Sequence, residues 1–220
     1  MAELDVKKSV KAQNDEIAEK NREIFRKSGA LVVNLMGSPG AGKTTLLEHV
    51  LPRLAKKLNV AVIEGDVATD NDAKRIAKTG VTALQIETGG ACHLDATMIE
   101  KRLGEVNVEK LDLLLIENVG NLVCPAGFDL GEDLRIVVLS LAEGDDKPEK
   151  YPAAFLRADW VALTKTDLAP YVGADIGRMK ESLARINPMA KAFCCAFQKG
   201  EYEDGGLSDG LIRLAEAKRK

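Results

Sequence analysis

Hydrophobic and polar positions follow two different patterns along this chain. Between residues 4 and 27, apolar side chains return at roughly helical spacing among many charged residues, and Gly29 follows them. This pattern predicts a leading amphipathic helix that ends near the glycine. After it, short apolar runs alternate with helical stretches. The apolar runs begin at Leu31, Val60, Thr82, Leu111, Arg135, Trp160 and Lys191, and the helical stretches cover residues 43–58, 72–79, 94–103, 151–157, 175–186 and 206–218.

Several of these apolar runs are uninterrupted, which is typical of strands buried on both faces. Strands that alternate with helices form a parallel sheet covered by helices on both sides. The sequence therefore predicts an α/β fold with a mostly parallel, seven-stranded sheet and helices on both faces. We expect residues 1–29 to form a helix packed on a single domain of residues 30–220, and the polar stretch 143–152 to be a loop within that domain.

The composition is that of an ordinary soluble globular protein. The chain has 220 residues, of which 45% are hydrophobic and 30% charged, and its formal net charge is -3. Positive and negative residues are interspersed, so no basic face for nucleic acid is expected. The first residues lack the apolar core of a signal peptide, and no apolar run approaches the ~20 residues of a membrane span. We expect a cytoplasmic protein without membrane contact, whose four cysteines stay reduced and are either buried or bound to metal.

Residues 37–44 match the phosphate-binding loop pattern G-x-x-x-x-G-K-[ST] in full. They follow a predicted strand and precede a predicted helix, which is the context that the motif requires. Lys43 is expected to reach the β- and γ-phosphates and to act in catalysis, and the Thr44 hydroxyl is expected to bind Mg²⁺. The sequence thus predicts a P-loop NTPase whose nucleotide contacts include Gly37, Ser38, Pro39, Gly40, Ala41, Gly42, Lys43, Thr44 and Thr45.

A second motif predicts which base is bound. Residues 164–167 read Thr-Lys-Thr-Asp and resemble the [N/T]-K-x-D element of GTPases. Asp167 is expected to accept hydrogen bonds from guanine N1–H and the exocyclic amine, whereas adenine presents an acceptor at that ring nitrogen. Lys165 is expected to lie along the base, and the Ala196 N–H to point at the guanine oxygen. Thr164 replaces the commoner asparagine, so a weaker loop-tethering hydrogen bond is expected there. The predicted substrate is GTP.

Carboxylates and a glycine near two other strand ends are candidate switch residues. Glu117 ends a predicted strand and is expected to hold Mg²⁺ and act in catalysis, while Gly120 is expected to present its N–H to the γ-phosphate. Asp66 and Asp72 lie at and beyond the end of another strand, where a carboxylate holds Mg²⁺ or orients the attacking water. We assign Asp66 to Mg²⁺ and Asp72 to catalysis. Helix capping stays open as the alternative for both, and for Asp70.

Two cysteines and a histidine form a candidate metal site. Cys92 and His93 are adjacent, and Cys124 lies four residues beyond Gly120. Two thiolates and an imidazole suit Ni²⁺ or Zn²⁺ and leave at least one coordination position for water, a partner chain or metal transfer. The spacing is not that of a zinc finger, so a chance grouping stays open as the alternative. The other two cysteines are expected to pack at a strand end.

Six stretches of the sequence are highly specific when taken jointly: GSPGAGKTT, EGDVATDNDAKRI, ETGGACHLDA, ENVGNLVCPA, EGDDKPEKYP and TKTDLAPY. They cover most of residues 31–197 and resemble the HypB family of hydrogenase-maturation GTPases. The resemblance implies a GTP-dependent homodimer in which Cys92, His93 and Cys124 of each subunit meet at the interface and bind nickel or zinc. It also implies nickel delivery coupled to GTP hydrolysis, with the metallochaperone HypA and the precursor of the nickel hydrogenase large subunit as partners. The chain lacks the histidine-rich stretch of some members, because its only histidines are His49 and His93.

Three other functions share parts of this pattern. A urease-type nickel accessory GTPase has Cys-Pro-His as its metal motif, whereas Cys124 and Pro125 are followed here by alanine. A P-loop kinase or simple ATPase shares the phosphate loop but not the guanine motif. A metal-binding adaptor with weak nucleotide turnover predicts lost phosphate ligands, yet Lys43, Thr44 and Glu117 are present. No arginine finger or glutamine is evident in the sequence, so slow turnover of ~10⁻⁴ to 10⁻² per second is expected.

Overall fold

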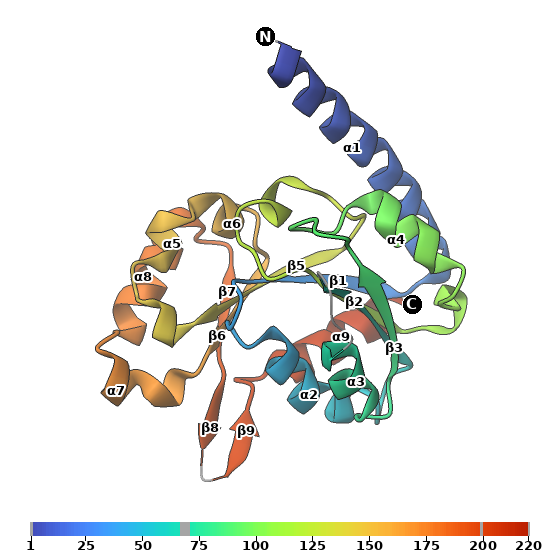
Figure 1. The fold of residues 1–220 in the computed structure, drawn as a ribbon. Helices are drawn as coiled ribbons and strands as arrows, with labels where there is room; N and C mark the ends of the chain where they lie inside the picture. Colours follow the sequence, from blue (N-terminus) through green and yellow to red (C-terminus); the bar gives the residue numbers. More distant parts are fainter. Residues whose placement is uncertain (1, 67–70, 199, 220) are drawn as a thin grey trace.

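The computed structural model describes residues 2–66, 71–198 and 200–219; for residues 2–9 and 198 it describes the backbone alone. Seven parallel strands form one sheet in the order β3-β2-β4-β1-β5-β6-β7, with helices on both faces (Figure 1). This confirms the predicted α/β class and the seven-stranded parallel sheet. The strands are β1 (Leu31–Met36), β2 (Val60–Asp66), β3 (Thr82–Glu87), β4 (Leu113–Glu117), β5 (Leu134–Ser140), β6 (Trp160–Thr164) and β7 (Lys191–Cys194).

The two faces of the sheet pack under different helices. On one face, α2, α3 and α9 cover a core that includes Leu47, Ile76 and Leu211. On the other, α1 and α4 cover a core that includes Phe25 and Ile99, and α6 and α8 cover the neighbouring part of that face (Figure 1). The helices are α1 (Ala2–Ser28), α2 (Lys43–Leu54), α3 (Asn71–Ala77), α4 (Ala96–Leu103), α5 (Lys147–Lys150), α6 (Pro152–Leu156), α7 (Ala169–Val172), α8 (Ile176–Ile186) and α9 (Leu207–Lys218), with 3₁₀ turns η1 (Val108–Lys110), η2 (Pro125–Gly127), η3 (Leu141–Glu143) and η4 (Thr166–Leu168).

The leading helix α1 binds the rest of the domain through one face. Asn14, Ala18, Asn21 and Phe25 recur at helical spacing and are buried, whereas the first turns project away from the domain (Figure 1). Gly131 has a φ of 90° and lies so close to the helix that a Cβ there would come 2.7 Å from the carbonyl oxygen of Ala18. The close approach therefore requires glycine at this position.

The polar stretch 143–152 differs from its prediction as a loop. It contains the short helix α5, and α6 begins at its end. Glu149 of α5 accepts hydrogen bonds from Ser182 (2.9 Å) and Arg185 (2.6 Å) of α8. The composition of this segment favours a loop, but these contacts with α8 stabilise it as a helix. Tertiary contacts thus override the local propensity.

The last predicted strand is interrupted at Cys195. β7 ends one residue earlier, and β8 (Ala196–Gln198) pairs with β9 (Glu201–Glu203) in an antiparallel hairpin. The Cys195 N–H donates to the Leu163 carbonyl of β6 at 2.7 Å, while its own carbonyl accepts from the Thr166 N–H at 3.2 Å. The chain is thereby turned toward the loop that follows β6. Helix α7, after that loop, is likewise absent from the predicted elements.

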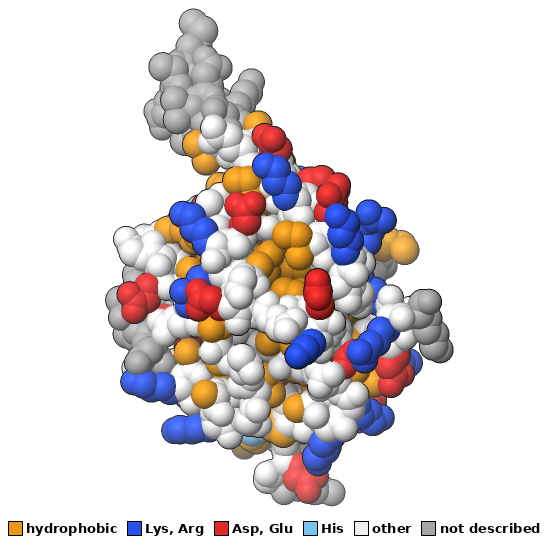
Figure 2. All heavy atoms as spheres, turned by 90° about the vertical axis from the view of Figure 1, so that its right-hand side faces the viewer, with side chains coloured by type: hydrophobic (Ala, Val, Ile, Leu, Met, Phe, Trp, Pro, Cys, Tyr) orange, Lys and Arg blue, Asp and Glu red, His pale blue; other side chains and the backbone are white. Residues whose placement is uncertain are grey.

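Charged side chains of both signs are mixed over the face of the molecule turned toward the viewer in Figure 2. The two signs are likewise interspersed along the sequence. Within the described part of the chain, none of the helices combines the length and the apolar character that a bilayer span requires.

Candidate functional site

The phosphate loop connects β1 to α2 at the carboxyl edge of the sheet. Gly40 and Gly42 have φ values of 75° and 94°, in the left-handed region that favours glycine. A Cβ at Gly37 would come 2.5 Å from the Val138 carbonyl oxygen, so this position too requires glycine. Helix α2 begins at Lys43, and its first N–H groups therefore point toward the loop, as in anion-binding helix termini.

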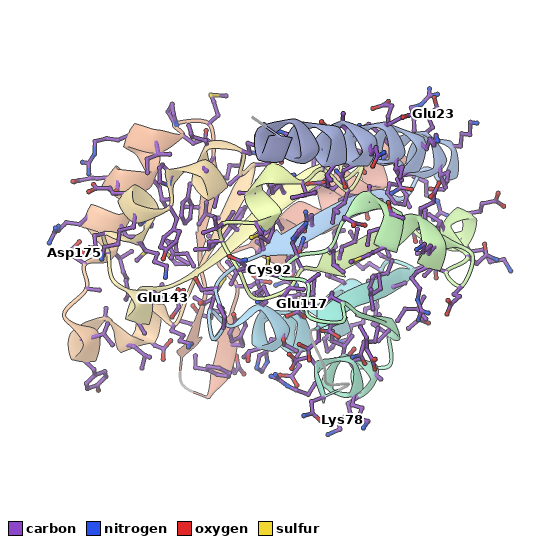
Figure 3. All side chains as sticks on the ribbon, turned by 45° about the horizontal axis from the view of Figure 1, so that its top comes forward. Glu23, Lys78, Cys92, Glu117, Glu143 and Asp175 are labelled. Atoms are coloured by element: carbon purple, nitrogen blue, oxygen red, sulfur yellow. The ribbon has the colours of Figure 1, made fainter. Side chains whose placement is uncertain are left out.

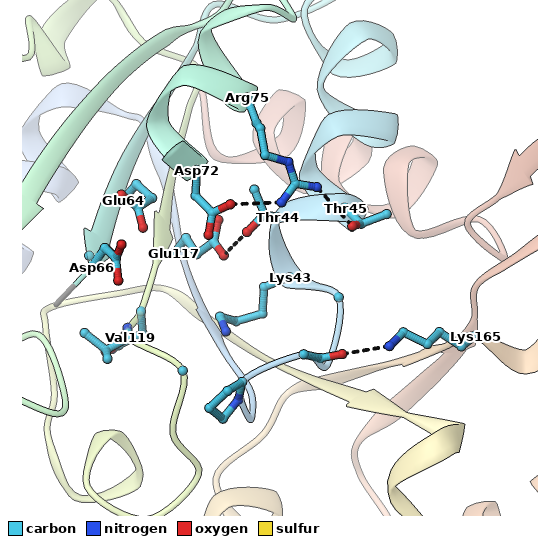
Figure 4. Close-up of a pocket in the computed structure, with 16 residues that line it drawn as sticks. Lys43, Thr44, Thr45, Glu64, Asp66, Asp72, Arg75, Glu117, Val119 and Lys165 are labelled. Atoms are coloured by element: carbon cyan, nitrogen blue, oxygen red, sulfur yellow. Dashed lines mark hydrogen bonds and ion pairs between the residues drawn. The ribbon is translucent and has the colours of Figure 1, made fainter. Parts of the chain in front are cut away.

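A cavity of about 490 Å³ lies over this loop and is lined by the ends of β2 and β4, the start of α3 and Lys165 (Figure 4). Lys43 is buried there and donates to the Gly37 carbonyl at 3.3 Å; burial lowers the pKa of Lys43. The size lies in the range of small-ligand sites. Among the predicted site residues, the lining includes Pro39, Gly40, Gly42, Lys43, Thr44, Thr45, Asp66, Asp72, Glu117, Gly120 and Lys165 but not Gly37, Ser38, Ala41, Asp167 or Ala196.

The candidate Mg²⁺ ligands Thr44 and Glu117 are in contact. The Thr44 hydroxyl donates to Glu117 Oε1 at 2.8 Å, and the second oxygen, Oε2, is buried with no hydrogen-bond partner among the described residues. Burial raises the pKa of Glu117 to about 7, against the opposing effect of the Lys43 charge. A hydroxyl and a carboxylate oxygen that lacks a partner, with Asp66 lining the same cavity, fit the oxygen ligands that Mg²⁺ prefers.

Glu64 is a pocket residue that the sequence analysis missed. It is the neighbour of Glu117 in the register of β2 and β4, and the two carboxylates face the same cavity (Figure 4). Glu64 is 2% exposed, and no described residue hydrogen-bonds its Oε2. Burial, and next the nearby Glu117, raise the pKa of Glu64 to about 8. An acidic residue inside an otherwise apolar strand was the available signal.

Asp72 is held in place by an arginine that the sequence analysis also missed. Arg75, one turn later in α3, donates to Asp72 (2.9 Å) and to Thr45 (3.2 Å) and forms an ion pair with Glu48 (2.6 Å). The arginine therefore ties the start of α3 to α2 beside the phosphate loop (Figure 4). Asp70, for which helix capping is the predicted alternative, lies outside the described residues.

The guanine motif lies against the phosphate loop. The Thr164 hydroxyl donates to the Ala41 carbonyl of the phosphate loop at 2.5 Å. Lys165 takes the left-handed conformation, with φ of 57°, and its ammonium donates to the Gly40 carbonyl at 2.8 Å. The Asp167 carboxylate accepts from the N–H of Phe197 at 3.4 Å, which brings the hairpin beginning at Ala196 next to the motif.

The turn after β4 covers the phosphate loop. A Cβ at Gly120 would come 3.1 Å from Pro39, and Asn121 forms an antiparallel bridge with Gly37. The turn therefore lies directly against the phosphate loop. The turn leads directly to Val123, 64% exposed, and to Cys124.

The three candidate metal ligands come together beside this turn. The ligand atoms of Cys92, His93 and Cys124 all lie within 4.8 Å of one another, and Cys92 Sγ is 3.7 Å from His93 Nδ1. The Asn121 amide donates to the Cys92 carbonyl at 3.2 Å, and the His93 ring lies 4.0 Å from that of Phe128. Burial lowers the pKa of His93, which favours the neutral imidazole that binds metal. Two sulfurs and one nitrogen suit nickel or zinc.

Comparison with known proteins decides the family. The model for the CobW/HypB/UreG nucleotide-binding domain matches residues 31–194. The hydrogenase maturation factor HypB of Escherichia coli (strain K12) is 45% identical over 205 residues, which are 93% of this chain and 71% of that protein. The chain belongs to the HypB family. The probable HypB of Methanocaldococcus jannaschii is 45% identical over 91% of both proteins, whereas the chain spans 66% of the length of the Rhizobium leguminosarum HypB, at 44% identity.

Solved HypB structures share the fold. HypB from Archaeoglobus fulgidus superposes with a TM-score of 0.83 at 43% identity, covering 94% of this chain and 99% of that one. HypB from Helicobacter pylori, solved in complex with nickel, gives 0.84 at 43% identity, covering 94% and 95%. The resemblance found in the sequence motifs is therefore confirmed, as is the P-loop NTPase fold. The roles of the individual site residues stay predictions.

Proposed function

We propose that this chain is a GTP hydrolase that couples nucleotide state and dimerisation to nickel delivery for hydrogenase maturation. One observation carries the proposal: the turn that covers the phosphate loop at Gly120 continues within four residues to Cys124, one of three clustered metal ligands. A displacement of this turn is therefore expected to displace the sulfur of Cys124. The names of the HypB relatives, and the nickel in the Helicobacter pylori structure, support hydrogenase and nickel as the target and the cargo.

In the nucleotide half of the site, Lys43 and the first N–H groups of α2 are assigned to the β- and γ-phosphates, and Asp167 and Lys165 to guanine. Thr44, Asp66 and Glu117 are assigned to Mg²⁺, which when bound neutralises charge on the phosphates. Asp72, fixed by Arg75, is assigned to orient the attacking water. Gly120 is assigned to bind the γ-phosphate, and its release after hydrolysis frees the turn.

In the metal half, Cys92, His93 and Cys124 give nickel or zinc three donors. Because these metals take at least four ligands in proteins, a further ligand must come from water or from a second chain. The side chains of Cys92 and Val123 are exposed, which supports this face as the docking face for the second subunit of the proposed homodimer. The metallochaperone HypA is the proposed metal donor and the large-subunit precursor of nickel hydrogenase the proposed acceptor, in the cytoplasm.

Urease maturation is a second candidate, because the Helicobacter pylori relative, 43% identical, is named a hydrogenase/urease maturation factor. A urease function carried by a HypB-type protein differs from the Cys-Pro-His accessory GTPase considered above. The same nucleotide and metal site serves either acceptor.

Base discrimination tests the enzymatic half of the proposal. The purified chain is expected to hydrolyse GTP with a kcat/KM at least about 100-fold above that for ATP, because adenine leaves the Asp167 carboxylate facing an acceptor. The Asp167→Ala variant should lose most of this preference, whereas Glu181→Ala, an exposed carboxylate on α8, should keep it. Equal turnover of GTP and ATP by the unmodified chain contradicts the assignment.

A further inference from the structure

Asn118 lies between the nucleotide turn and the metal loop. It follows Glu117 directly, and it is 2% exposed. Its side-chain oxygen accepts hydrogen bonds from the N–H of Val119 and from the N–H of Leu94, each at 3.0 Å. Leu94 is the residue after His93. One amide oxygen therefore joins the backbone of the γ-phosphate turn to the backbone that carries two metal ligands, and the segments of Cys92 and Glu117 lie close together (Figure 3).

The amide nitrogen of Asn118 begins a second connection. It donates to the side-chain oxygen of Asn34 at 3.3 Å, and Asn34 donates in turn to Glu132 Oε1 at 3.2 Å. Asn34 lies in β1, three residues before the phosphate loop, and is fully buried. Glu132 forms a buried ion pair with Arg135. The network thus passes from the turn, through the strand that leads into the phosphate loop, to β5.

Arg135 carries the connection to the third metal ligand. Its guanidinium donates to the carbonyls of Ala126 (3.4 Å) and Phe128 (3.1 Å), in the segment that follows Cys124. The Phe128 ring packs on the ring of His93. Both loops that supply metal ligands are therefore anchored by one buried polar network that has Asn118 at its centre.

We infer that Asn118 is a positioning residue that transmits the nucleotide state to the metal site; this inference rests on the proposed function. A buried hydrogen bond is costly to break without a replacement, so displacement of the turn must either carry the Leu94 backbone along or leave its N–H unpaired. If the turn carries the Leu94 backbone along, the nucleotide state changes the free energy of nickel binding, and that change is the coupling free energy between nucleotide and metal. Because such coupling is reciprocal, nickel must change the ratio of the affinities for the GTP analogue and for GDP by the same factor.

The test is the nickel affinity measured with a non-hydrolysable GTP analogue divided by the nickel affinity measured with GDP. In the unmodified chain we expect a ratio of at least about 5, the lower end of typical allosteric coupling. Asn118→Ala should reduce it to below about 2, while both nickel and nucleotide still bind. Asn118→Leu removes the same bonds without leaving a cavity and serves where the alanine variant does not fold.

Asn187→Ala is the matched control. The Asn187 amide, at the end of α8, donates to three carbonyls in and just after α6, those of Phe155, Leu156 and Ala158, so its loss also removes structural hydrogen bonds. This variant should be destabilised yet keep the full ratio. If a folded Asn118 variant keeps the ratio of the unmodified chain, the positioning role is refuted and the proposed function stands. If the unmodified chain itself shows a ratio of 1, the proposed coupling fails first and the inference fails with it.

Discussion

Replacement of Cys124 by alanine is expected to lower the nickel affinity of the chain by at least about 100-fold. Loss of second-shell partners alone typically weakens metal binding 10- to 100-fold, and loss of a thiolate ligand removes a direct bond. Cys92 and His93 remain in place, so two of the three clustered donors are left. Competition with a chromophoric chelator measures the change.

Cys194→Ala is the matched control for this experiment. Cys194 is also a free, partly buried thiol, but it lies at the end of β7 and outside the metal cluster. The Cys194→Ala variant should bind nickel with an affinity within about twofold of that of the unmodified chain, which is a difference of about 0.4 kcal/mol in binding free energy. Equal nickel affinity in the Cys124 variant and the unmodified chain would place the metal elsewhere.

Replacement of Lys43 by alanine is expected to lower kcat/KM for GTP by at least about 100-fold. A preorganised cation or donor aimed at developing charge contributes at least that factor to the rate. Lys43 is the buried ammonium in the cavity, directly at the start of α2. Steady-state phosphate release, together with titration of a fluorescent GTP analogue, separates the loss of binding from the loss of turnover.

The exposed Lys57, just beyond α2, provides the comparison for Lys43. Lys57→Ala should keep normal turnover. The Lys43 variant should also bind nickel with the same affinity whether GTP analogue or GDP is added, because the nucleotide no longer acts on the turn at Gly120. Normal GTP turnover by the Lys43 variant means that the phosphates bind outside this loop.

Local sequence patterns predict the sheet and the phosphate loop because both depend on short-range features. Uninterrupted apolar runs indicate strands buried on both faces. Gly40 and Gly42 supply the positive φ values that the phosphate loop requires. The candidate metal ligands were also selected from the sequence, but Cys92 and Cys124 lie on different loops, and only the strand order brings their sulfurs together.

Residues that act through distant partners were not predictable in this way. Glu64 faces the cavity beside Glu117 because β2 and β4 are neighbours in the sheet, which the order of the strands along the chain does not reveal. Asn118 meets the backbone of Leu94 across 24 positions of sequence. The sequence shows Glu64 only as an acidic residue within an apolar run, and the partners of such polar groups are known only when the strand order and the hydrogen bonds are known.

In the proposed mechanism the nucleotide controls the metal through a turn that contacts the phosphate loop at Gly120 and leads to the sulfur of Cys124. The most direct measurement determines nickel affinity, nickel stoichiometry and oligomeric state of the unmodified chain, with GDP and with a non-hydrolysable GTP analogue. We expect a dimer and tighter nickel binding with the analogue, and weaker nickel binding with GDP. The same nickel affinity and the same oligomeric state with both nucleotides would contradict it.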